Sequence, residues 1–380
     1  PPAAGPAEIV DDSCAISYRP GDPAAAAGAL LKLLADPELA AAMGRHGRER
    51  ARSHFSLEAS RARFRRALHE LGPRRPGGSL APDRLALITV THNSAGELAS
   101  LLASVDRHLP GGHVVVVDSA SGDGTVKLAR DWPGPRPPTV IALGENAGFG
   151  SACNLGIAAA GEPVAVLLNP DIELLDDSLL RLAEEALRRD RPERLLAPLV
   201  LSPDGTRQNS AHPRPTSPAA FAFALIPPAA LPAGAGSHLA PWRSRRPRRV
   251  GWAVGCAVLA RTETLRRLGP FDEGIFLFGE DLDLGLRATQ AGVATWFWPE
   301  ARVLHYGAHA TAPAFGGEPF DLLARARHDV VVRRLGPRRA RLDDLAQAVT
   351  FGSRIVLKRA LGRATERERR QLQAVRRLGG

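Results

Sequence analysis

The alternation of apolar runs and helical segments between residues 85 and 168 constrains the fold most strongly. Four runs rich in Val, Ile and Leu are separated by three segments with helical spacing, at 85–91, 95–108, 114–117, 125–131, 139–143, 150–160 and 164–168. Short apolar runs of this kind indicate strands that are buried on both faces. Strands that alternate with helices predict a parallel sheet with right-handed crossovers, and therefore an α/β fold.

The remaining chain divides by composition. We expect a helical unit at 1–71, a Gly- and Pro-rich linker at 72–83, the α/β domain at 84–310 and a basic helical region at 311–380. In the first unit, the pattern predicts a short strand at Glu8–Val10 and helices at 24–34, 37–52 and 56–71, with Asp22 as an N-cap. In the α/β domain, it predicts helices and strands at 178–189, 198–210, 250–260, 262–268, 281–291, 294–298 and 303–305. Residues 211–242 lack periodicity and are expected to form a mobile loop or flap.

Charge and cysteine content limit the class of protein. There are 50 Lys and Arg against 40 Asp and Glu, and the excess lies at 243–249 and 333–377. Such patches suit phosphates, nucleic acid or an anionic membrane surface, although Arg-rich solvated helix faces explain them equally well. We expect no nucleic-acid partner. The three cysteines are far apart, which argues against a disulfide framework or a zinc site and favours a reducing cytoplasm.

No apolar stretch reaches the length of a membrane-spanning helix. We therefore predict a cytoplasmic protein, with contact to the inner face of the plasma membrane through the basic C-terminal region as a further expectation. The chain begins with Pro1-Pro2 and no Met, which suggests a fragment of a longer polypeptide.

Polar and glycine-rich loops follow the first four predicted strands. They are residues 91–93, 118–124, 145–150 and 169–171. The carboxyl ends of parallel strands meet at one edge, where open α/β folds bind ligands, so these loops predict a nucleotide pocket. Simple turns are the alternative for each loop taken singly. A dinucleotide-binding fingerprint after the first strand and a P-loop are both absent.

Four acidic residues and a histidine are candidates for chemistry. Asp171 ends the fourth strand and is predicted to hold a divalent metal against a diphosphate. Glu280, Asp281 and Asp283 lie at a predicted helix N-terminus, where mutual repulsion would raise a proton affinity and favour a general base. Capping by Asp281 and an Asp283–Arg287 pair are the structural alternatives. His305 is either structural or a ligand for an ion of the Mn²⁺ type.

Taken in order, these motifs resemble the inverting GT-A glycosyltransferases of family 2, and in particular their rhamnosyltransferase-like branch. The matching segments cover about 84–310 and include Val90–Asn93, Val117–Thr125, Asn146–Gly150, Leu168–Asp171, Glu280–Asp283 and Pro299–His305. The resemblance implies the GT-A fold, a Rossmann-like mixed sheet. Ser119 stands where the family commonly has Asn, and His92 where Tyr is frequent, so base stacking is expected to differ.

The resemblance also implies a reaction. A sugar, with rhamnose as a candidate, would move from a nucleoside-diphosphate sugar to a hydroxyl of a glycan or lipid-linked acceptor in cell-surface polysaccharide or glycolipid synthesis. Asp281 would be the general base, and Asp171 and His305 would hold Mg²⁺ or Mn²⁺, with Glu280, Asp283 and Arg287 in support. Donor-binding residues would be Thr91, His92, Asn93, Asp118, Asn146, Gly148, Gly150, Asn154 and Asn169. A non-catalytic nucleotide-sugar or polyanion-binding protein, and a nucleotidyltransferase, are the alternatives.

The first unit resembles a different family. Its motifs from Glu8 to Ser56 are similar to the C-terminal tail of GT-B glycosyltransferases of family 4. In that family the glutamate that matches Glu8 contacts the donor nucleotide. The rest of both GT-B domains is missing, so we interpret the unit as a remnant, a fusion junction or the end of a longer upstream enzyme.

Overall fold

The computed structural model describes residues 9–19, 21–56, 80–226, 231, 233–269, 271–307 and 318–379. The chain forms two compact units, Pro1–Gly72 and Pro73–Gly380. The predictions made for Glu8, for residues 57–71 of the helix expected at 56–71 and for linker residues 72–79 lie outside the described residues.

The first unit contains two capped helices, α2 (Pro23–Ala35) and α3 (Pro37–Phe55). The Asp22 carboxylate accepts a 2.9 Å bond from the N–H of Ala25, and Asp36 caps α3 in the same way. Both helices begin with Pro, whose fixed φ suits the first helical position. Neither helix buries a residue, so the described part of this unit has little apolar packing of its own.

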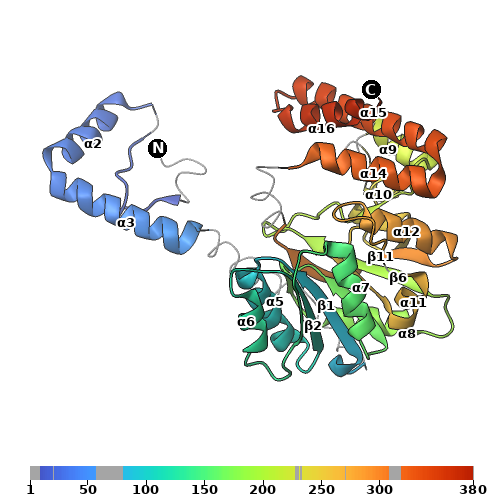
Figure 1. Ribbon diagram of the computed structural model, residues 1–380. Helices are drawn as coiled ribbons and strands as arrows, with labels where there is room; N and C mark the ends of the chain where they lie inside the picture. The colour runs from blue at the N-terminus through green and yellow to red at the C-terminus, as the bar shows by residue number, and fades with distance from the viewer. Residues whose placement is uncertain are drawn as a thin grey trace. The chain divides into compact units, whose positions relative to one another are not determined.

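The second unit is organised around a mixed sheet of nine strands among the described residues (Figure 1). Four strands that the sequence predicts, β1 (Leu85–Thr91), β2 (His113–Ser119), β3 (Thr139–Leu143) and β4 (Val164–Leu168), are mutually parallel in the order β3-β2-β1-β4. Their carboxyl ends therefore meet at one edge, which carries the four polar loops.

The other half of the sheet is mixed rather than parallel. It contains β5 (Ile172–Leu174), β6 (Arg194–Leu201), β8 (Arg248–Val250), β10 (Ala257–Arg261) and β11 (Ala294–His305). From β4 the order continues β10-β6-β11-β5, and β8 pairs with β11. Strand β10 runs antiparallel to β4, and β5 runs antiparallel to β11. These two pairings bring late segments of the chain to the loops after β4.

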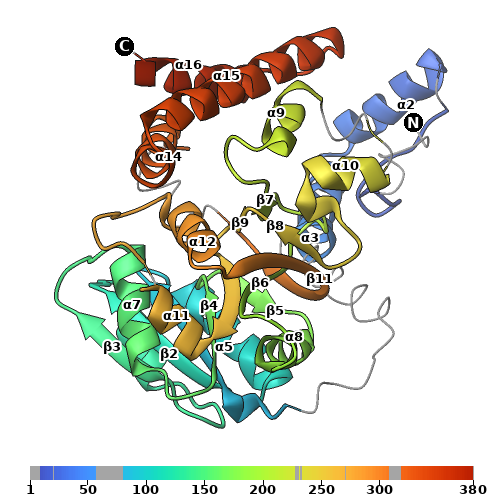
Figure 2. The ribbon, with the colours of Figure 1, turned by 90° about the vertical axis from the view of Figure 1, so that its right-hand side faces the viewer.

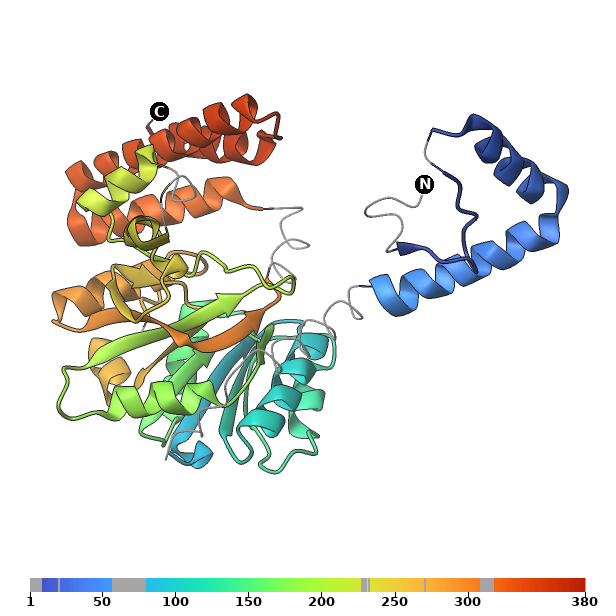
Figure 3. The same ribbon diagram turned by 180° about the vertical axis from the view of Figure 1, so that it is seen from behind.

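Helices cover both faces of the sheet (Figures 1 and 3). One face packs on α5 (Ala95–His108), α6 (Thr125–Arg130) and α8 (Ser178–Leu187), in a core that includes Leu101, Leu182 and Val166. The other face packs on α7 (Phe149–Ala159), α11 (Thr262–Leu268) and α12 (Glu280–Gln290). The strands are buried on both faces, as their continuous apolar composition predicts.

Three C-terminal helices form a layer above α12, as Figure 2 shows. They are α14 (Phe320–Leu335), α15 (Pro337–Ala360) and α16 (Glu366–Arg376). Val330 and Val331 of α14 pack on Leu282 and Leu286 of α12. The shorter elements are α9 (Pro218–Leu225), α10 (Ala233–Leu239), β7 (Ala211–His212), β9 (Trp252–Ala253), η1 (Pro82–Arg84), η3 (Pro241–Arg243) and η4 (Arg377–Gly379). None of the helices in the described residues is long and apolar enough to cross a bilayer.

Two sequence predictions are wrong. The segment at 211–242 is not a structureless loop, because its Ala-rich helix α9 finds a partner in α15, where the Ser353 hydroxyl donates to the Ala224 carbonyl at 3.0 Å. The predicted strand at 250–260 is three short strands instead. It is broken because β9 pairs with β7, outside the main sheet. In contrast, 294–298 and 303–305 belong to one strand, β11, with a bulge between Trp298 and Arg302.

A buried carboxylate ties the C-terminal layer to the sheet domain. Asp283 of α12 is fully buried and accepts bonds from Arg287 Nε at 2.7 Å and from Arg334 Nε of α14 at 2.6 Å. We predict that Asp283→Asn lowers the free energy of unfolding by about 3 kcal/mol, because both guanidinium groups lose this buried anion, while Arg334 keeps a second one, Asp272. Urea unfolding measures this loss. The matched control is Asp321→Asn, whose ion pair with Arg377 is exposed and should contribute little. Equal effects of the two changes would contradict the prediction.

Candidate active site

The loops after β1 and β2 are held together by hydrogen bonds between their own residues. Asp118 is 1% exposed and accepts bonds from Thr91 Oγ1 at 2.8 Å and from the hydroxyl of Ser121 at 2.5 Å. Asn93 has a φ of +52° and accepts a 2.8 Å bond from the N–H of Gly122. His92 Nδ1 lies 2.6 Å from the Ser119 carbonyl. The structure therefore brings together the predicted donor-binding residues Thr91, His92, Asn93 and Asp118, and it uses several of their polar atoms to fix the loop geometry.

The predicted glycine loop before α7 holds another loop in place. Gly148 has a φ of +79°, and a Cβ there would lie 2.4 Å from the carbonyl oxygen of Phe276. Asn146 Oδ1 accepts a 3.1 Å bond from the N–H of Gly148. The amide of Asn154 bonds both the N–H and the carbonyl of Phe271, at 2.9 and 3.0 Å. Gly150 also faces Phe271, whose Cβ would lie 3.0 Å from an added Cβ. The Asn154 side chain thus binds the loop that precedes α12.

Asp171 and His305 meet because β5 pairs with β11. His305 lies opposite Ile172 in that pairing, and its Nε2 is 3.2 Å from Asp171 Oδ1. The other oxygen of Asp171 accepts a 2.8 Å bond from the N–H of Gly307. Burial opposes ionisation of Asp171, but the bond and charge of His305 and the N–H of Gly307 outweigh it, so the pKa of Asp171 is lowered.

Gln208, which the sequence analysis missed, orients His305. Its Nε2 donates to the His305 carbonyl at 2.8 Å and to the Ser202 hydroxyl at 3.2 Å, and its Oε1 lies 2.8 Å from His305 Nδ1. With its amide so oriented, Gln208 can only accept from Nδ1, and neutral His305 then carries its proton there. The protonated imidazole donates to Asp171 through Nε2, and once that proton is lost the lone pair of Nε2 faces the Asp171 carboxylate.

Two facing electron-pair donors, a carboxylate oxygen and an imidazole nitrogen, suit a cation between or beside them. No group of three or more His, Cys, Asp or Glu side chains in the described residues could hold a metal. Two protein ligands are nevertheless sufficient for Mg²⁺ or a similar ion that keeps waters and substrate phosphates as its other ligands. Asn169 Nδ2 also lies 3.4 Å from His305 Nε2. The residues present therefore fit a divalent ion that is shared with a diphosphate.

The antiparallel pairing of β10 with β4 connects this pair to α12. The N–H of Asn169 donates to the Cys256 carbonyl at 3.0 Å, and the N–H of the preceding Gly255 lies 3.3 Å from Asp281 Oδ2. Burial, together with the negative charges of Asp171 and Asp281, raises the pKa of Cys256 to about 12. The Cys256 thiol is thus within electrostatic reach of both carboxylates.

The N-terminus of α12 carries three acids in three different environments. Gly279, with a φ of +86°, is the N-cap, so the structural alternative in which Asp281 caps this helix does not hold. Burial raises the pKa of Asp281, although the N–H groups of Leu282 and Gly255 partly stabilise its anion. Burial and the neighbouring Asp281 raise the pKa of Glu280 to about 8. Asp283 forms an ion pair with Arg287, and the guanidinium balances its negative charge.

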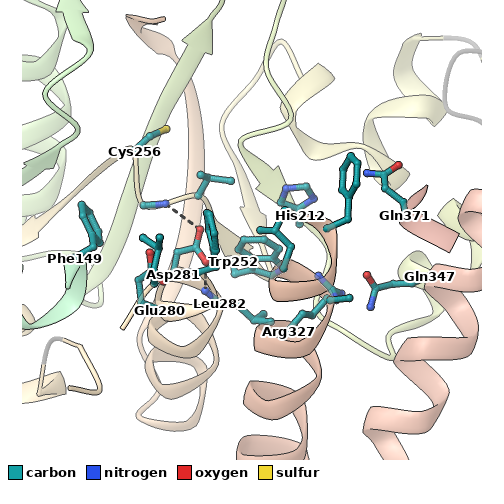
Figure 4. A pocket seen from close by; sticks show the side chains of 18 of the residues that line it. Phe149, His212, Trp252, Cys256, Glu280, Asp281, Leu282, Arg327, Gln347 and Gln371 are labelled. Atoms are coloured by element: carbon teal, nitrogen blue, oxygen red, sulfur yellow. Dashed lines mark hydrogen bonds between the residues drawn. The ribbon is translucent and has the colours of Figure 1, made fainter. Parts of the chain in front are cut away.

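A cavity of about 560 Å³ opens beside Glu280 and Asp281 (Figure 4). Figure 4 shows these acids on one side and Arg327, Gln347 and Gln371 of the C-terminal helices on the other. The Arg327 guanidinium donates to the Asp343 carboxylate at 2.7 and 3.0 Å. Burial and the positive charge of Arg327 lower the pKa of His212 to about 4. The sequence did not predict that the C-terminal helices line this cavity, because no local pattern indicates which of their residues face α12.

Comparison with known proteins agrees with this architecture. The model of "Glycosyl transferase family 2" matches residues 86–221. The N-acetylglucosaminyl-diphospho-decaprenol L-rhamnosyltransferase of Mycobacterium tuberculosis is 33% identical over 263 residues, which are 64% of this chain and 81% of that protein. Rhamnosyltransferase WbbL of Escherichia coli is 38% identical over 60 residues, 16% of this chain and 23% of that protein. This chain therefore belongs to glycosyltransferase family 2.

Solved structures with a similar arrangement are more distant. A mannosyltransferase from Pyrobaculum calidifontis in complex with GDP-Man and Mn²⁺ is 17% identical, with a TM-score of 0.47 over 86% of this chain and 89% of that one. GalNAc-T7 with UDP, GalNAc and Mn²⁺ is also 17% identical, with a TM-score of 0.47 over 68% of this chain and 48% of that one.

Because the pKa of Glu280 is raised in the folded chain, the free energy of unfolding should depend on pH. Between the ordinary value of 4.5 and about 8, the folded chain keeps a proton on Glu280 that the unfolded chain has lost. This stabilising contribution is present below 4.5 and is lost as the pH rises toward 8, by at most about 1.4 kcal/mol per pH unit. We expect Glu280→Gln to remove this slope. Urea unfolding of both proteins near pH 5 and near pH 8 measures it, and the variant should gain on the native protein as the pH rises. A pH-independent difference would refute the assignment.

Proposed function

We propose that this chain is an inverting glycosyltransferase in which Asp281 is the general base. The observation that carries the proposal is the setting of Asp281, a carboxylate at the edge of the 560 Å³ cavity that two backbone N–H groups hold in place. A carboxylate whose pKa is raised by burial accepts a proton more readily than one in water. A cavity of this size can admit the sugar end of an acceptor beside it.

The reaction needs one displacement. The acceptor hydroxyl donates a hydrogen bond to Asp281, and its oxygen attacks the anomeric carbon of the donor sugar from the face opposite the diphosphate. The new C–O bond forms as the bond to the diphosphate oxygen breaks, and the hydroxyl proton passes to the Asp281 carboxylate. The nucleoside diphosphate leaves, and the anomeric configuration is inverted.

The donor would lie at the carboxyl edge of the parallel strands. Asp171 and His305, with Gln208 behind the imidazole, would hold Mg²⁺ or Mn²⁺, and such an ion neutralises charge on the leaving diphosphate. We propose that the loops carrying Thr91, His92, Asn93 and Asp118 bind the base and ribose. Asn146, Gly148, Gly150 and Asn169 border the remaining donor region, and Asn154 supports it through Phe271.

The relatives suggest the substrates. Both curated relatives are named rhamnosyltransferases, and the mycobacterial one is named for an acceptor in which N-acetylglucosamine is linked to decaprenol through a diphosphate. We propose a nucleoside-diphosphate rhamnose as donor and a lipid-linked glycan as acceptor, in the synthesis of cell-envelope polysaccharide. Such an acceptor would place the enzyme at the cytoplasmic face of the membrane, with the basic C-terminal region beside anionic lipid.

We predict that Asp281→Asn reduces sugar transfer by about 10²–10⁴-fold, the usual contribution of a general base, and leaves donor affinity unchanged. Release of nucleoside diphosphate with an acceptor panel measures transfer, and calorimetry measures donor binding. Asp83→Asn is a control because Asp83 is an exposed carboxylate that does not line the cavity. Undiminished transfer by Asp281→Asn would exclude the base role. Donor binding without transfer by the native protein would favour the non-catalytic alternative, and release of pyrophosphate would favour nucleotidyl transfer.

A second prediction concerns the metal. Asp171→Ala should abolish the gain in donor affinity on adding Mn²⁺, since it removes the anionic ligand. Gln208→Leu should weaken Mn²⁺ binding by about 10–100-fold, because His305 loses the group that fixes its orientation. Calorimetry with Mn²⁺ and a nucleoside-diphosphate sugar gives both values without an activity assay. The control is Gln373→Leu, an exposed glutamine of α16. Native Mn²⁺ affinity in both Asp171→Ala and Gln208→Leu would place the metal elsewhere.

A further inference from the structure

One side of helix α15 is largely exposed in the described part of the chain. The helix has 24 residues, so it is about 36 Å long. Residues spaced three or four apart lie on one side of it, and we call this side the outer face. It consists of Arg338, Arg341, Leu342, Leu345, Val349, Gly352, Val356 and Arg359. Leu342, Leu345 and Val356 are 46%, 59% and 69% exposed, unusually high values for large aliphatic side chains.

The other sides of α15 are occupied. Asp343 pairs with Arg327 of α14, Lys358 pairs with Glu368 of α16, and Ser353 bonds the last turn of α9. In Figures 1 and 2, α15 and α16 form the part of the helical layer that is farthest from the sheet. The outer face is therefore the side of α15 that the described residues of the second unit leave most exposed.

Charge is segregated across α15. Its two carboxylates point inward, where Asp343 binds Arg327 and Asp344 binds His328. Arg338, Arg341 and Arg359 are exposed and form no ion pair with any described residue. The outer face thus carries arginines toward both of its ends and aliphatic side chains between them, with no acid.

The combination of exposed arginines and aliphatic side chains distinguishes between the possible binding partners of the outer face. A second copy docked through the same face would oppose arginine to arginine, because a two-fold interface uses the same patch twice. Nucleic acid would neutralise the arginines but leave Leu345 and Val356 in water. An anionic bilayer satisfies both kinds of side chain, since aliphatic groups enter the acyl boundary while guanidinium groups bind lipid phosphates.

We propose that the outer face of α15 lies on the surface of an anionic lipid bilayer. The proposal rests on the proposed function, and it specifies how the cavity would lie relative to the membrane that holds the acceptor. Gln347 and Phe351, on the inward side of the same helix, line the cavity next to Asp281. The bilayer surface would then lie about one helix diameter, roughly 10 Å, from the cavity wall. A lipid-linked acceptor could reach Asp281 while its lipid stays in the membrane.

Flotation with vesicles tests the proposal on the full chain. The vesicles are phosphatidylcholine alone, or equal parts of phosphatidylcholine and phosphatidylglycerol. We expect binding to the anionic vesicles only. Arg341→Gln/Arg359→Gln should weaken it on the order of 30-fold, at about 1 kcal/mol for each arginine. Leu345→Ser/Val356→Ser should weaken it on the order of tenfold or more. Arg107→Gln/Arg130→Gln removes the same charge from exposed positions on α5 and α6 and should bind normally.

Several outcomes would overturn the proposal. They are equal binding to both kinds of vesicle, binding to neither, or equal loss in the α15 and control pairs. A dimer in solution that Leu345→Ser dissociates would assign the face to a second copy instead. Transfer to a water-soluble acceptor without vesicles should be unchanged in the α15 variants. If that transfer is absent from the native protein, the proposed function fails, and the vesicle result is judged separately.

Discussion

The antiparallel pairing of β10 with β4 is the interaction on which the candidate site depends. Four parallel strands alone would supply a loop-lined edge with Asp171 and little else. Because β10 returns alongside β4, Gly255 and Cys256 arrive next to Asn169, and the N–H of Gly255 reaches Asp281. The predicted metal site and the predicted base are thereby joined through one short turn. The β5–β11 pairing completes the edge by placing His305 at Asp171.

The acidic start of α12 shows how neighbouring residues acquire different roles. Asp283 faces two arginines and ties the C-terminal helices to the sheet domain. Glu280 is buried, with Oε2 lacking a partner among the described residues, and its proton affinity is strongly raised. Asp281 lies between these extremes, since its anion is held by backbone N–H groups while burial still raises its pKa. Of the three, Asp281 alone both lines the cavity and has its anion bonded by two backbone N–H groups from Gly255 and Leu282.

Local pattern predicted the first half of the domain well, because continuous apolar runs and helix spacing are strong signals there. It failed where distant contacts decide the structure. Residues 211–242 look irregular alone, but α9 forms because α15 covers it. The run at 250–260 is broken because β9 pairs with β7. The pairing of Asp171 with His305 followed from the family resemblance, and Gln208 was not predicted, since a neutral amide far away in sequence gives no signal. Arg327 and Gln347 were missed because no local pattern shows which residues of the basic C-terminal helices face α12.

The central claim is that one carboxylate, Asp281, activates the acceptor for a single displacement. The anomeric configuration of the product tests this most directly, since a single displacement must invert it. The one-bond carbon–proton coupling at the anomeric carbon, measured by NMR on the isolated glycoside and on the donor sugar, reports the configuration. Opposite anomeric configurations are expected in donor and product. Retention of configuration would require a different mechanism and would contradict the role assigned to Asp281.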